Sequence, residues 1–290
     1  MNFYSTYLLP IILFIIMIGI GMSAKLKDFK ILVKNPKAGL IGILSQILLL
    51  PCLGFIIGTI LNLTHLQMVG ILLITLCPSG SGSNIISKMV GADLALSVSL
   101  TTISSLLSLI ILPLVLNYYI DLNNNSFNNI RLPIIESLIQ IFLTSVLPVA
   151  LGLLVSEKKP NIVEVVKPTL KWLLPGMLFI VFCLIFIFES GENNIDKMVY
   201  FFIIAFILNI FSMLLAFGVS KLCKINQEHA LSISIEGGLK NSAIGLFVAL
   251  NILNSEVIAN ILIAYGMVSF YTTFLLSYGI KKITIKKAYL

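Results

Sequence analysis

The chain has 290 residues, of which 58% are hydrophobic and 11% are charged. No soluble domain needs so large an apolar fraction, so the composition excludes a soluble enzyme or binding module and predicts an all-α polytopic membrane protein. The formal net charge of +7 does not indicate nucleic-acid binding, because the lysines stand at the ends of apolar runs.

Apolar runs long enough for a helix to cross a bilayer, about 20 residues each, recur along the whole chain. We expect about nine membrane-spanning helices, at about residues 4–22, 37–60, 67–90, 93–120, 132–155, 168–189, 197–220, 228–250 and 255–280. The gaps between these runs are short, so residues 1–290 are expected to form a single transmembrane unit surrounded by lipid.

The basic residues predict how the chain is oriented in the membrane. All but four of the 19 lysines and arginines follow the first, fifth, seventh or ninth run, and these segments share one face. Because loops rich in lysine and arginine remain cytoplasmic, we expect a multi-pass protein of the cell membrane. Its N-terminus would lie outside and its C-terminus in the cytoplasm.

The third run is interrupted by the stretch CPSGSGSN at residues 77–84. Pro78, Gly80 and Gly82 disfavour a continuous helix there. The same stretch offers the polar side chains of Ser81, Ser83 and Asn84.

The fourth run carries hydroxyl groups at spacings of 4, 3 and 4 residues, which places them on one helical face. They belong to Ser97, Thr101, Ser104 and Ser108. A stripe of small hydroxyl residues can also serve only to let membrane helices pack closely.

The eighth run contains Glu236, Lys240 and Asn241 around the pair Gly237–Gly238. Charged residues within a bilayer are costly and mark ion or substrate pathways. A carboxylate beside several neutral oxygens suits a hard monovalent cation, and broken helices near the membrane centre form such sites in secondary transporters. The sequence therefore predicts a cation site around Glu236.

The third and eighth runs cross the membrane in opposite directions, because four runs, an even number, lie between them along the chain. Two broken helices of opposite direction are typical of an inverted repeat. We therefore predict two crossed discontinuous helices, with Pro78–Asn84 and Glu236–Asn241 unwound where they cross.

At these residues the chain resembles the bile acid:sodium symporter family. The family's first crossover and the helix after it are matched by LCPSGSGSNIISKMVGADLALSVSLTTISSLLS, and its second crossover by SIEGGLKNSA. The start of its core domain is matched by KDFKILVKNPKAGLIGILSQILLLP. The resemblance covers essentially the whole chain and is to the nine-span form of the family.

The resemblance implies a panel moving against a core. The panel would contain the helices at about 4–22, 132–155 and 168–189, and the core those at about 37–120 and 197–280. A small organic anion, of bile-acid-like or small-carboxylate type, would bind between them near the crossover. The cleft residues so implied are Pro78, Gly80, Ser81, Gly82, Asn84, Asn241 and Ser242.

The resemblance also implies two sodium sites. The first would consist of Ser83, Asn84, Ser97, Thr101 and Glu236. The second would consist of Gln46, Glu236, Gly237 and Leu239, with Lys240 where the family has a glutamine. We expect Lys240 to pair with Glu236 as a built-in cation, so that at most one sodium ion couples transport. No other cofactor is expected.

The predicted function is secondary active transport by alternating access, in which sodium or a proton drives uptake of the organic anion. A cation/proton exchanger of related fold and a sodium-independent organic anion transporter are the alternatives. A receptor or scaffold would not explain Glu236, Lys240 and Asn84 inside the bilayer. The sequence contains no hydrolytic nucleophile–base set and no phosphate-binding loop, so we do not expect an enzyme.

Overall fold

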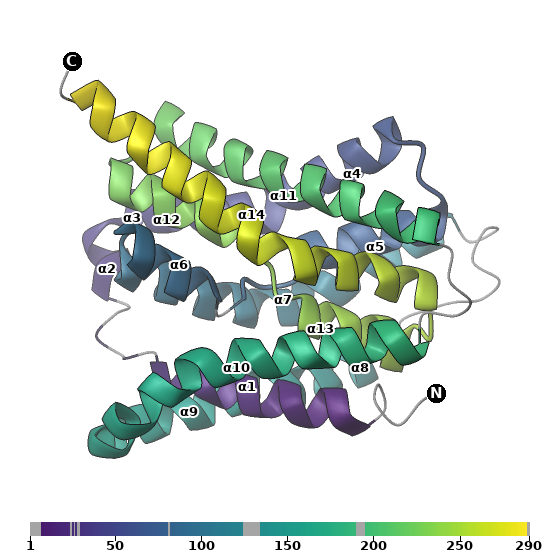
Figure 1. Cartoon of the computed structure of the whole chain (residues 1–290), viewed down its shortest axis with the longest axis horizontal. Helices are drawn as coiled ribbons and strands as arrows, with labels where there is room; N and C mark the ends of the chain where they lie inside the picture. The colour runs from purple at the N-terminus through teal and green to yellow at the C-terminus, as the bar shows by residue number, and fades with distance from the viewer. Residues whose placement is uncertain are drawn as a thin grey trace.

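The structure is a computed structural model that describes residues 7–23, 25, 27, 30–80, 82–123, 134–189 and 195–288. These residues form α-helices and short π-helical segments joined by brief links, and they contain no β-strand. The all-α fold is therefore confirmed. The long helices α1, α10, α11 and α14 run along the long axis of the molecule (Figure 1).

The helices of the first half of the chain are α1 (Leu9–Ser23), α2 (Lys30–Lys34), α3 (Pro36–Leu44), η3 (Ser45–Leu49), α4 (Leu50–Ile60), α5 (His65–Leu76), α6 (Gly82–Val90) and α7 (Leu94–Leu122). Those of the second half are α8 (Ile134–Ile141), η5 (Phe142–Val146), α9 (Leu147–Lys158), α10 (Pro160–Glu189), α11 (Ile195–Leu222), α12 (Gln227–Gly238), α13 (Ser242–Phe247), η6 (Val248–Ile252) and α14 (Glu256–Ala288). The segments labelled η are π-helical.

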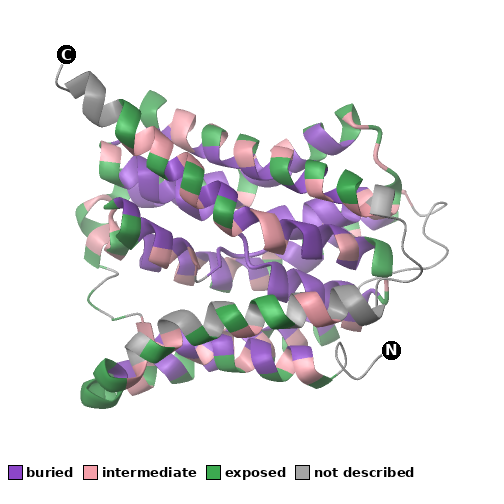
Figure 2. Cartoon of the chain, in the orientation of Figure 1, coloured by how far each residue is buried: buried purple, intermediate pink, exposed green. Residues whose placement is uncertain are grey.

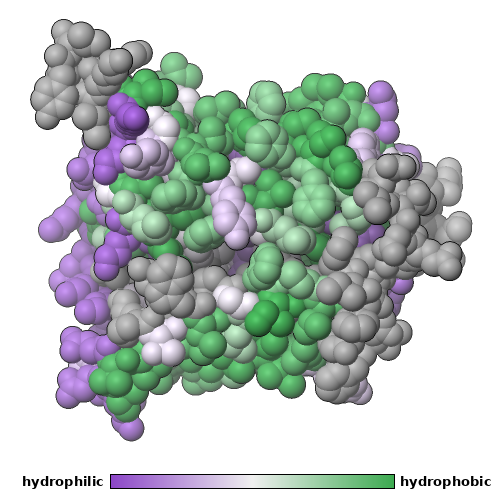
Figure 3. All heavy atoms as spheres, viewed as in Figure 1, coloured by the Kyte–Doolittle hydropathy of each residue, from purple (hydrophilic) through white to green (hydrophobic). Residues whose placement is uncertain are grey.

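Several of these helices are long and apolar enough to cross a membrane. In the described part of the chain there are five, at Pro36–Ile60, Leu94–Leu122, Ile135–Lys158, Met198–Leu222 and Glu256–Ile283. Figure 3 shows apolar residues across the middle of the visible face and hydrophilic ones gathered at the end where the C-terminus lies. A multi-pass membrane protein is therefore confirmed, whereas the total of nine spans remains a prediction.

The third and eighth runs are each divided into two helices, and the two breaks meet. The amide of Gly80 donates to the carbonyl of Leu239 at 2.9 Å, and the amide of Asn241 donates to the carbonyl of Pro78 at 2.8 Å. Ser79 and Lys240 thereby form an isolated antiparallel bridge. The two unwound stretches thus lie against each other, as predicted.

The breaks are shorter than predicted. Residues 82–84 belong to α6 and residues 236–238 to α12, so the expectation that they are unwound was wrong. The helix α5 ends before Pro78, which is where the lack of a proline N–H and the restriction on the preceding residue favour a break. The glycine pair of α12 remains helical because it packs closely: a Cβ on Gly237 would lie 3.1 Å from the Cβ of Ala216.

A proline also explains the π-helical turn that carries Gln46. The proline at position 51 has no N–H for the carbonyl of Ile47, so a regular α-helical bond is missing there. The chain accommodates this with η3, in which the amide of Leu50 donates to the carbonyl of Ser45. A single π turn of this kind often occurs at a functional site.

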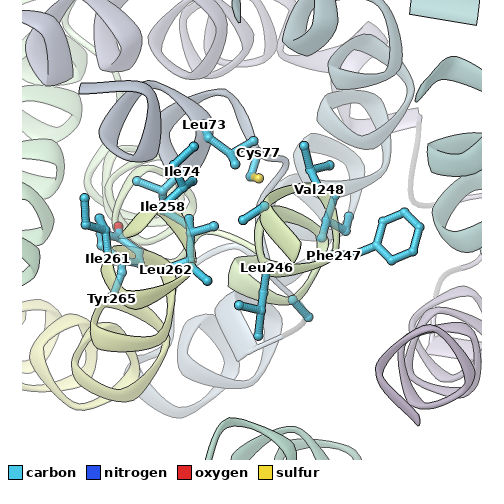
Figure 4. Close-up of a cluster of buried hydrophobic side chains, with 14 of the residues drawn as sticks. Leu73, Ile74, Cys77, Leu246, Phe247, Val248, Ile258, Ile261, Leu262 and Tyr265 are labelled. Atoms are coloured by element: carbon cyan, nitrogen blue, oxygen red, sulfur yellow. The ribbon is translucent and has the colours of Figure 1, made fainter. Parts of the chain in front are cut away.

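Buried residues concentrate on α5, α12 and α13 in the middle of the molecule, whereas α11 and α14 have both buried and exposed faces (Figure 2). A large apolar cluster packs α13 and η6 against α5 and α14. Figure 4 shows Ile258 and Leu262 of α14 in this cluster, with Phe247 pointing away from α14. The half-helix after the second break is therefore enclosed on several sides.

Candidate functional site

The centre of the candidate site is the carboxylate of Glu236, in the last turn of α12. Glu236 is fully buried. Its Oε1 accepts a hydrogen bond from Ser97 at 2.5 Å, and its Oε2 accepts one from Thr101 at 2.8 Å. The two hydroxyls are one turn apart on α7, as their spacing predicts, so one face of α7 binds both carboxylate oxygens.

The rest of the hydroxyl stripe on α7 does not contact Glu236. Ser104 donates to the carbonyl of Thr101 at 3.0 Å, and Ser108 donates to the carbonyl of Ser105 at 3.0 Å. The stripe therefore divides in two: its first two members bind the carboxylate, and its last two satisfy carbonyls of their own helix.

The start of α7 is fixed to α12 by Asp93. This residue caps α7, because its Oδ1 accepts a hydrogen bond from the amide of Leu96 at 2.9 Å. Its Oδ2 lies 3.1 Å from Nε2 of His229, and its carbonyl accepts from the hydroxyl of Ser232 at 2.9 Å. Both His229 and Ser232 belong to α12, so the two helices that bear the site are tied together near their ends.

The helix α6 supplies the remaining groups of the predicted first sodium site. Ser83 donates to the carbonyl of Gly80 at 2.8 Å and lies 3.4 Å from the hydroxyl of Thr101. The amide oxygen of Asn84 is buried and has no hydrogen-bond partner among the described residues. An unsatisfied buried oxygen costs about 1–3 kcal/mol. A buried oxygen without a donor, on the helix that also brings Ser83 to Thr101, fits a cation ligand.

Two residues of the site were missed by sequence reasoning. Ser79 is buried, and its hydroxyl bonds to Oε1 of Gln46 at 2.8 Å and to the backbone carbonyl of Glu236 at 2.9 Å. Ser87 donates to the hydroxyl of Ser97 at 3.1 Å. Two features of the sequence could have indicated them. Ser79 lies inside the interrupted stretch, and Ser87 lies four residues after Ser83, which places both on one helical face.

The side chain of Lys240 is buried beside the crossing. It lines a small cavity, with room for about one water molecule, together with Gln46, Ile47, Leu76, Cys77, Pro78, Ser104, Ser108 and Ile111. The Nε2 of Gln46 is buried there and has no partner among the described residues. Gln46 and Lys240 are thus neighbours, as predicted.

The predicted ion pair between Glu236 and Lys240 is wrong for this structure. Glu236 and Lys240, both in the described part of the chain, form no ion pair with each other; an ion pair near the site joins His229 and Asp93 instead. The reason is that α12 stays helical to Gly238 and directs Glu236 toward α7, whereas Lys240 follows in the unwound stretch. The carboxylate of Glu236 accepts hydrogen bonds from the hydroxyls of Ser97 and Thr101, whereas Lys240 lines the small cavity beside Gln46.

Oxygens at and beside the predicted second sodium site already accept hydrogen bonds from protein donors. The carbonyl of Glu236 accepts from Ser79, and that of Leu239 accepts from the amide of Gly80. The remaining residue of that set, Gly237, packs against α11 through Ala216. These bonds leave fewer oxygens for a second ion.

The predicted cleft residues adjoin the crossing and α1. The Nδ2 of Asn241 lies 3.9 Å from the sulfur of Met17 on α1, and its Oδ1 caps α13 at the amide of Ile244. The hydroxyl of Ser242 is buried and lacks a partner in the described regions. A Cβ on Gly82 would lie 3.2 Å from the ring of Phe270. Ser81 lies outside the described residues.

Comparison with known proteins adds a family and several relatives. A family model described as the Sodium Bile acid symporter family matches residues 10–198. A Bacillus subtilis (strain 168) protein named "Uncharacterized sodium-dependent transporter YocS" is 30% identical over 84% of this chain and 74% of its own length.

Two mammalian relatives are matched over a smaller part of their length. The "P3 protein" of Bos taurus is 26% identical over 83% of this chain and 50% of its own. The "Ileal sodium/bile acid cotransporter" of Homo sapiens is 34% identical over 54% of this chain and 45% of its own. The chain therefore spans about half the length of these two proteins.

Proposed function

Because the chain belongs to the sodium bile acid symporter family, we propose that it is a secondary active transporter that couples sodium entry to uptake of an organic anion. Membership confirms the resemblance drawn from the crossover motifs and agrees with the expectation of a transporter rather than an enzyme. The observation that carries the proposal is the buried carboxylate of Glu236, held by two hydroxyls where two broken helices meet.

The sodium ion binds Glu236 together with oxygens of Ser83, Asn84, Ser97 and Thr101. A carboxylate buried without a counter-ion is costly in a bilayer. A bound sodium ion neutralises it, and the hydroxyl and amide oxygens replace part of the ion's hydration shell. The orphan oxygen of Asn84 is satisfied at the same time. Closure of the transporter around a sodium site without its ion is therefore disfavoured. This couples the movement of the organic anion to that of sodium.

We further infer that Lys240 acts as a built-in cation in place of a second sodium ion, so that at most one sodium ion is used. The proposal is supported by the burial of Lys240 and by the cavity that it shares with Gln46. It is also supported by the carbonyls of Glu236 and Leu239, which already accept hydrogen bonds from the protein. A fixed ammonium supplies positive charge at the crossing without an ion from solution.

The organic anion, bile-acid-like or a small carboxylate, binds beside the crossing. The helix α6 begins there, and a helix N-terminus favours negative charge. The amide of Asn241 lies near Met17 of α1, and the hydroxyl of the next residue, Ser242, is buried without a partner among the described residues. The name of the human relative includes a bile acid as the transported compound, which supports this class of substrate.

The transporter has nine spans, with the N-terminus outside, the C-terminus in the cytoplasm, and an inverted repeat that contains the two broken helices. The panel comprises α1, α8–α9 and α10, and the remaining helices form the core. The distribution of lysines and the opposite directions of α5–α6 and α12–α13 support this arrangement. Movement of the panel against the core gives alternating access.

Uptake into proteoliposomes tests the proposal. The purified protein is offered bile acids and small carboxylates under an inward gradient of sodium, potassium or protons. We expect sodium-driven uptake of at least one anion, reduced by about 100-fold in Glu236→Gln. Thr102→Ala serves as the control, because the hydroxyl of Thr102 donates to the carbonyl of Val98 within α7. Equal uptake in potassium, unaffected by Glu236→Gln, would contradict the proposal.

The burial of Lys240 favours a second candidate, in which transport is linked to protons or is independent of sodium. A buried lysine carries a proton that can be exchanged when the site opens to water. In that case a proton gradient alone drives uptake, and Lys240→Gln abolishes that uptake. A cation/proton exchanger would instead move sodium with no organic anion present.

A further inference from the structure

A second polar network, formed by side chains of α11 and α14, holds the end of α12. The carbonyl of Gly238, the last residue of α12, accepts a hydrogen bond from Nδ2 of Asn209 at 2.6 Å and another from the hydroxyl of Tyr265. Asn209 belongs to α11 and Tyr265 to α14, and both side chains are fully buried. Two different helices therefore converge on one carbonyl.

This carbonyl depends on those side chains. The last carbonyls of a helix have no intrahelical donor. The amide four residues further along, that of Ser242, donates instead to the carbonyl of Lys240 at 3.0 Å. Without Asn209 and Tyr265, a buried acceptor at the crossing would lose the donors it has here.

Asn209 is itself held at both ends of its amide group. Its Oδ1 accepts from the hydroxyl of Thr272 at 2.6 Å, and its Nδ2 also lies 3.1 Å from the hydroxyl of Thr273. The approach of α12 favours glycine, because a Cβ on Gly238 would clash with Cγ of Met213 on α11 and would lie 3.0 Å from that Thr273 hydroxyl. The contact is therefore close and its orientation is fixed.

The Gly238 carbonyl lies two residues from the carboxylate that centres the cation site. From α7, Ser97 and Thr101 bind the side chain of Glu236. From α11 and α14, Asn209 and Tyr265 bind the backbone of the same helical turn. The position of the carboxylate relative to α7 and α6 thus depends on both sets of bonds.

We propose that Asn209, together with Tyr265, is a positioning residue for the cation site: by holding the Gly238 carbonyl it fixes Glu236 and so sets the affinity for sodium. This inference rests on the proposed sodium-coupled function. Neither side chain bonds to the carboxylate itself. Partners one layer behind metal ligands typically change metal affinity by about 10–100-fold when they are removed.

The test is the sodium-dependent thermal stabilisation of the purified full-length protein, titrated with sodium chloride against potassium chloride. The variants are Asn209→Ala and Tyr265→Phe. We expect the sodium concentration at half-maximal stabilisation to rise by about tenfold or more in each. Ser220→Ala is the matched control and should leave it unchanged, because Ser220 is buried on α11 and donates only to the Ala216 carbonyl of its own helix.

The outcomes separate this inference from the function on which it rests. A wild-type protein without sodium-specific stabilisation contradicts the sodium site and the proposed function. A wild-type protein that responds, with both variants responding at the same sodium concentrations, overturns only the positioning role. The variants could also melt at lower temperatures in potassium chloride while their sodium concentration at half-maximal stabilisation stays unchanged. That result would show a purely structural role and would overturn the positioning role as well. Tyr265→Phe keeps the ring in place, so it provides the test if Asn209→Ala does not fold.

Discussion

Among single residues, similar side chains on one helix have different roles. Ser97 and Thr101 bind Glu236, whereas Ser104 and Ser108 bind carbonyls of α7. The sequence spacing correctly predicts a shared face, because helical periodicity is a local property. It cannot predict how far along this face the carboxylate lies, because that depends on where α12 crosses α7.

Thr101 and its neighbour Thr102 allow a matched test of this division. Thr101→Val removes the donor to Oε2 of Glu236 while preserving the shape of the side chain. A hydrogen bond to a charged group contributes about 1.5–3 kcal/mol, so we expect at least a tenfold higher sodium requirement for uptake. Thr102 donates to the carbonyl of Val98 at 2.9 Å, so Thr102→Val should behave as wild type. The same loss in both variants would contradict a specific role for Thr101.

Lys240 gives a second prediction at this scale. Lys240→Gln removes the fixed positive charge and adds an amide oxygen beside Gln46. We expect the sodium dependence of uptake to become steeper, because a second ion can then bind and the Hill coefficient can exceed about one. The measurement is initial uptake against sodium concentration in both proteins. If the sodium dependence of uptake is already steep in the wild type and is the same in Lys240→Gln, Lys240 does not replace an ion.

The residues that sequence analysis missed or misplaced share a physical cause. Ser79 contacts Gln46, 33 positions away, and the backbone of Glu236, 157 positions away. Such bonds depend on how distant helices cross, which no local pattern contains. The expected Glu236–Lys240 pair failed for a related reason, since the spacing of four applies only while the helix continues, and α12 ends at Gly238.

At the scale of whole elements, proline predicted the break better than glycine did. The helix α5 ends at Leu76, two residues before Pro78, because the proline ring and its missing N–H act through the local backbone. Gly237 and Gly238 do not break α12, because close contacts with α11 and α14 keep them helical. Whether a glycine breaks a helix depends on tertiary packing. The unwound stretches predicted from the sequence were therefore longer than those in the structure.

Glycines also bring α1 and α9 together. A Cβ on Gly152 would lie 2.9 Å from the Cα of Gly21 and 2.8 Å from the amide of Met22. These are backbone atoms, so the two helices must separate to admit even a methyl group. We expect Gly152→Ala to destabilise the protein by about 1–3 kcal/mol, seen as a lower melting temperature in detergent. Gly218→Ala is the control, since no described atom lies within 4 Å of its added Cβ. Equal stability of the two variants would contradict this packing argument.

Across the whole molecule, the buried apolar residues show where the proposed panel meets the core. One cluster contains residues of the panel helices α1, α8 and α9 together with residues of the core helices α5 and α13. It also contains residues from one end of each of the core helices α7, α11 and α14, and in each case this is the end away from the lysine-rich face. The two other clusters lie toward the lysine-rich face, and their described members come only from helices of the proposed core. In the proposed orientation, with the lysine-rich face in the cytoplasm, this cluster would close the outer side of the molecule.

Phe247 lies in the cluster that makes this closure, is 5% exposed, and points away from α14 (Figure 4). In a protein whose native cysteines are replaced, Phe247→Cys should be protected from a membrane-impermeant thiol reagent added outside without sodium. External sodium must reach Glu236 from that side, which requires the cluster to open, so sodium should accelerate labelling. Glu136→Cys, exposed at the start of α8, should label at a constant rate. If Phe247→Cys labels as fast as Glu136→Cys in the absence of sodium, this cluster does not close the path from outside.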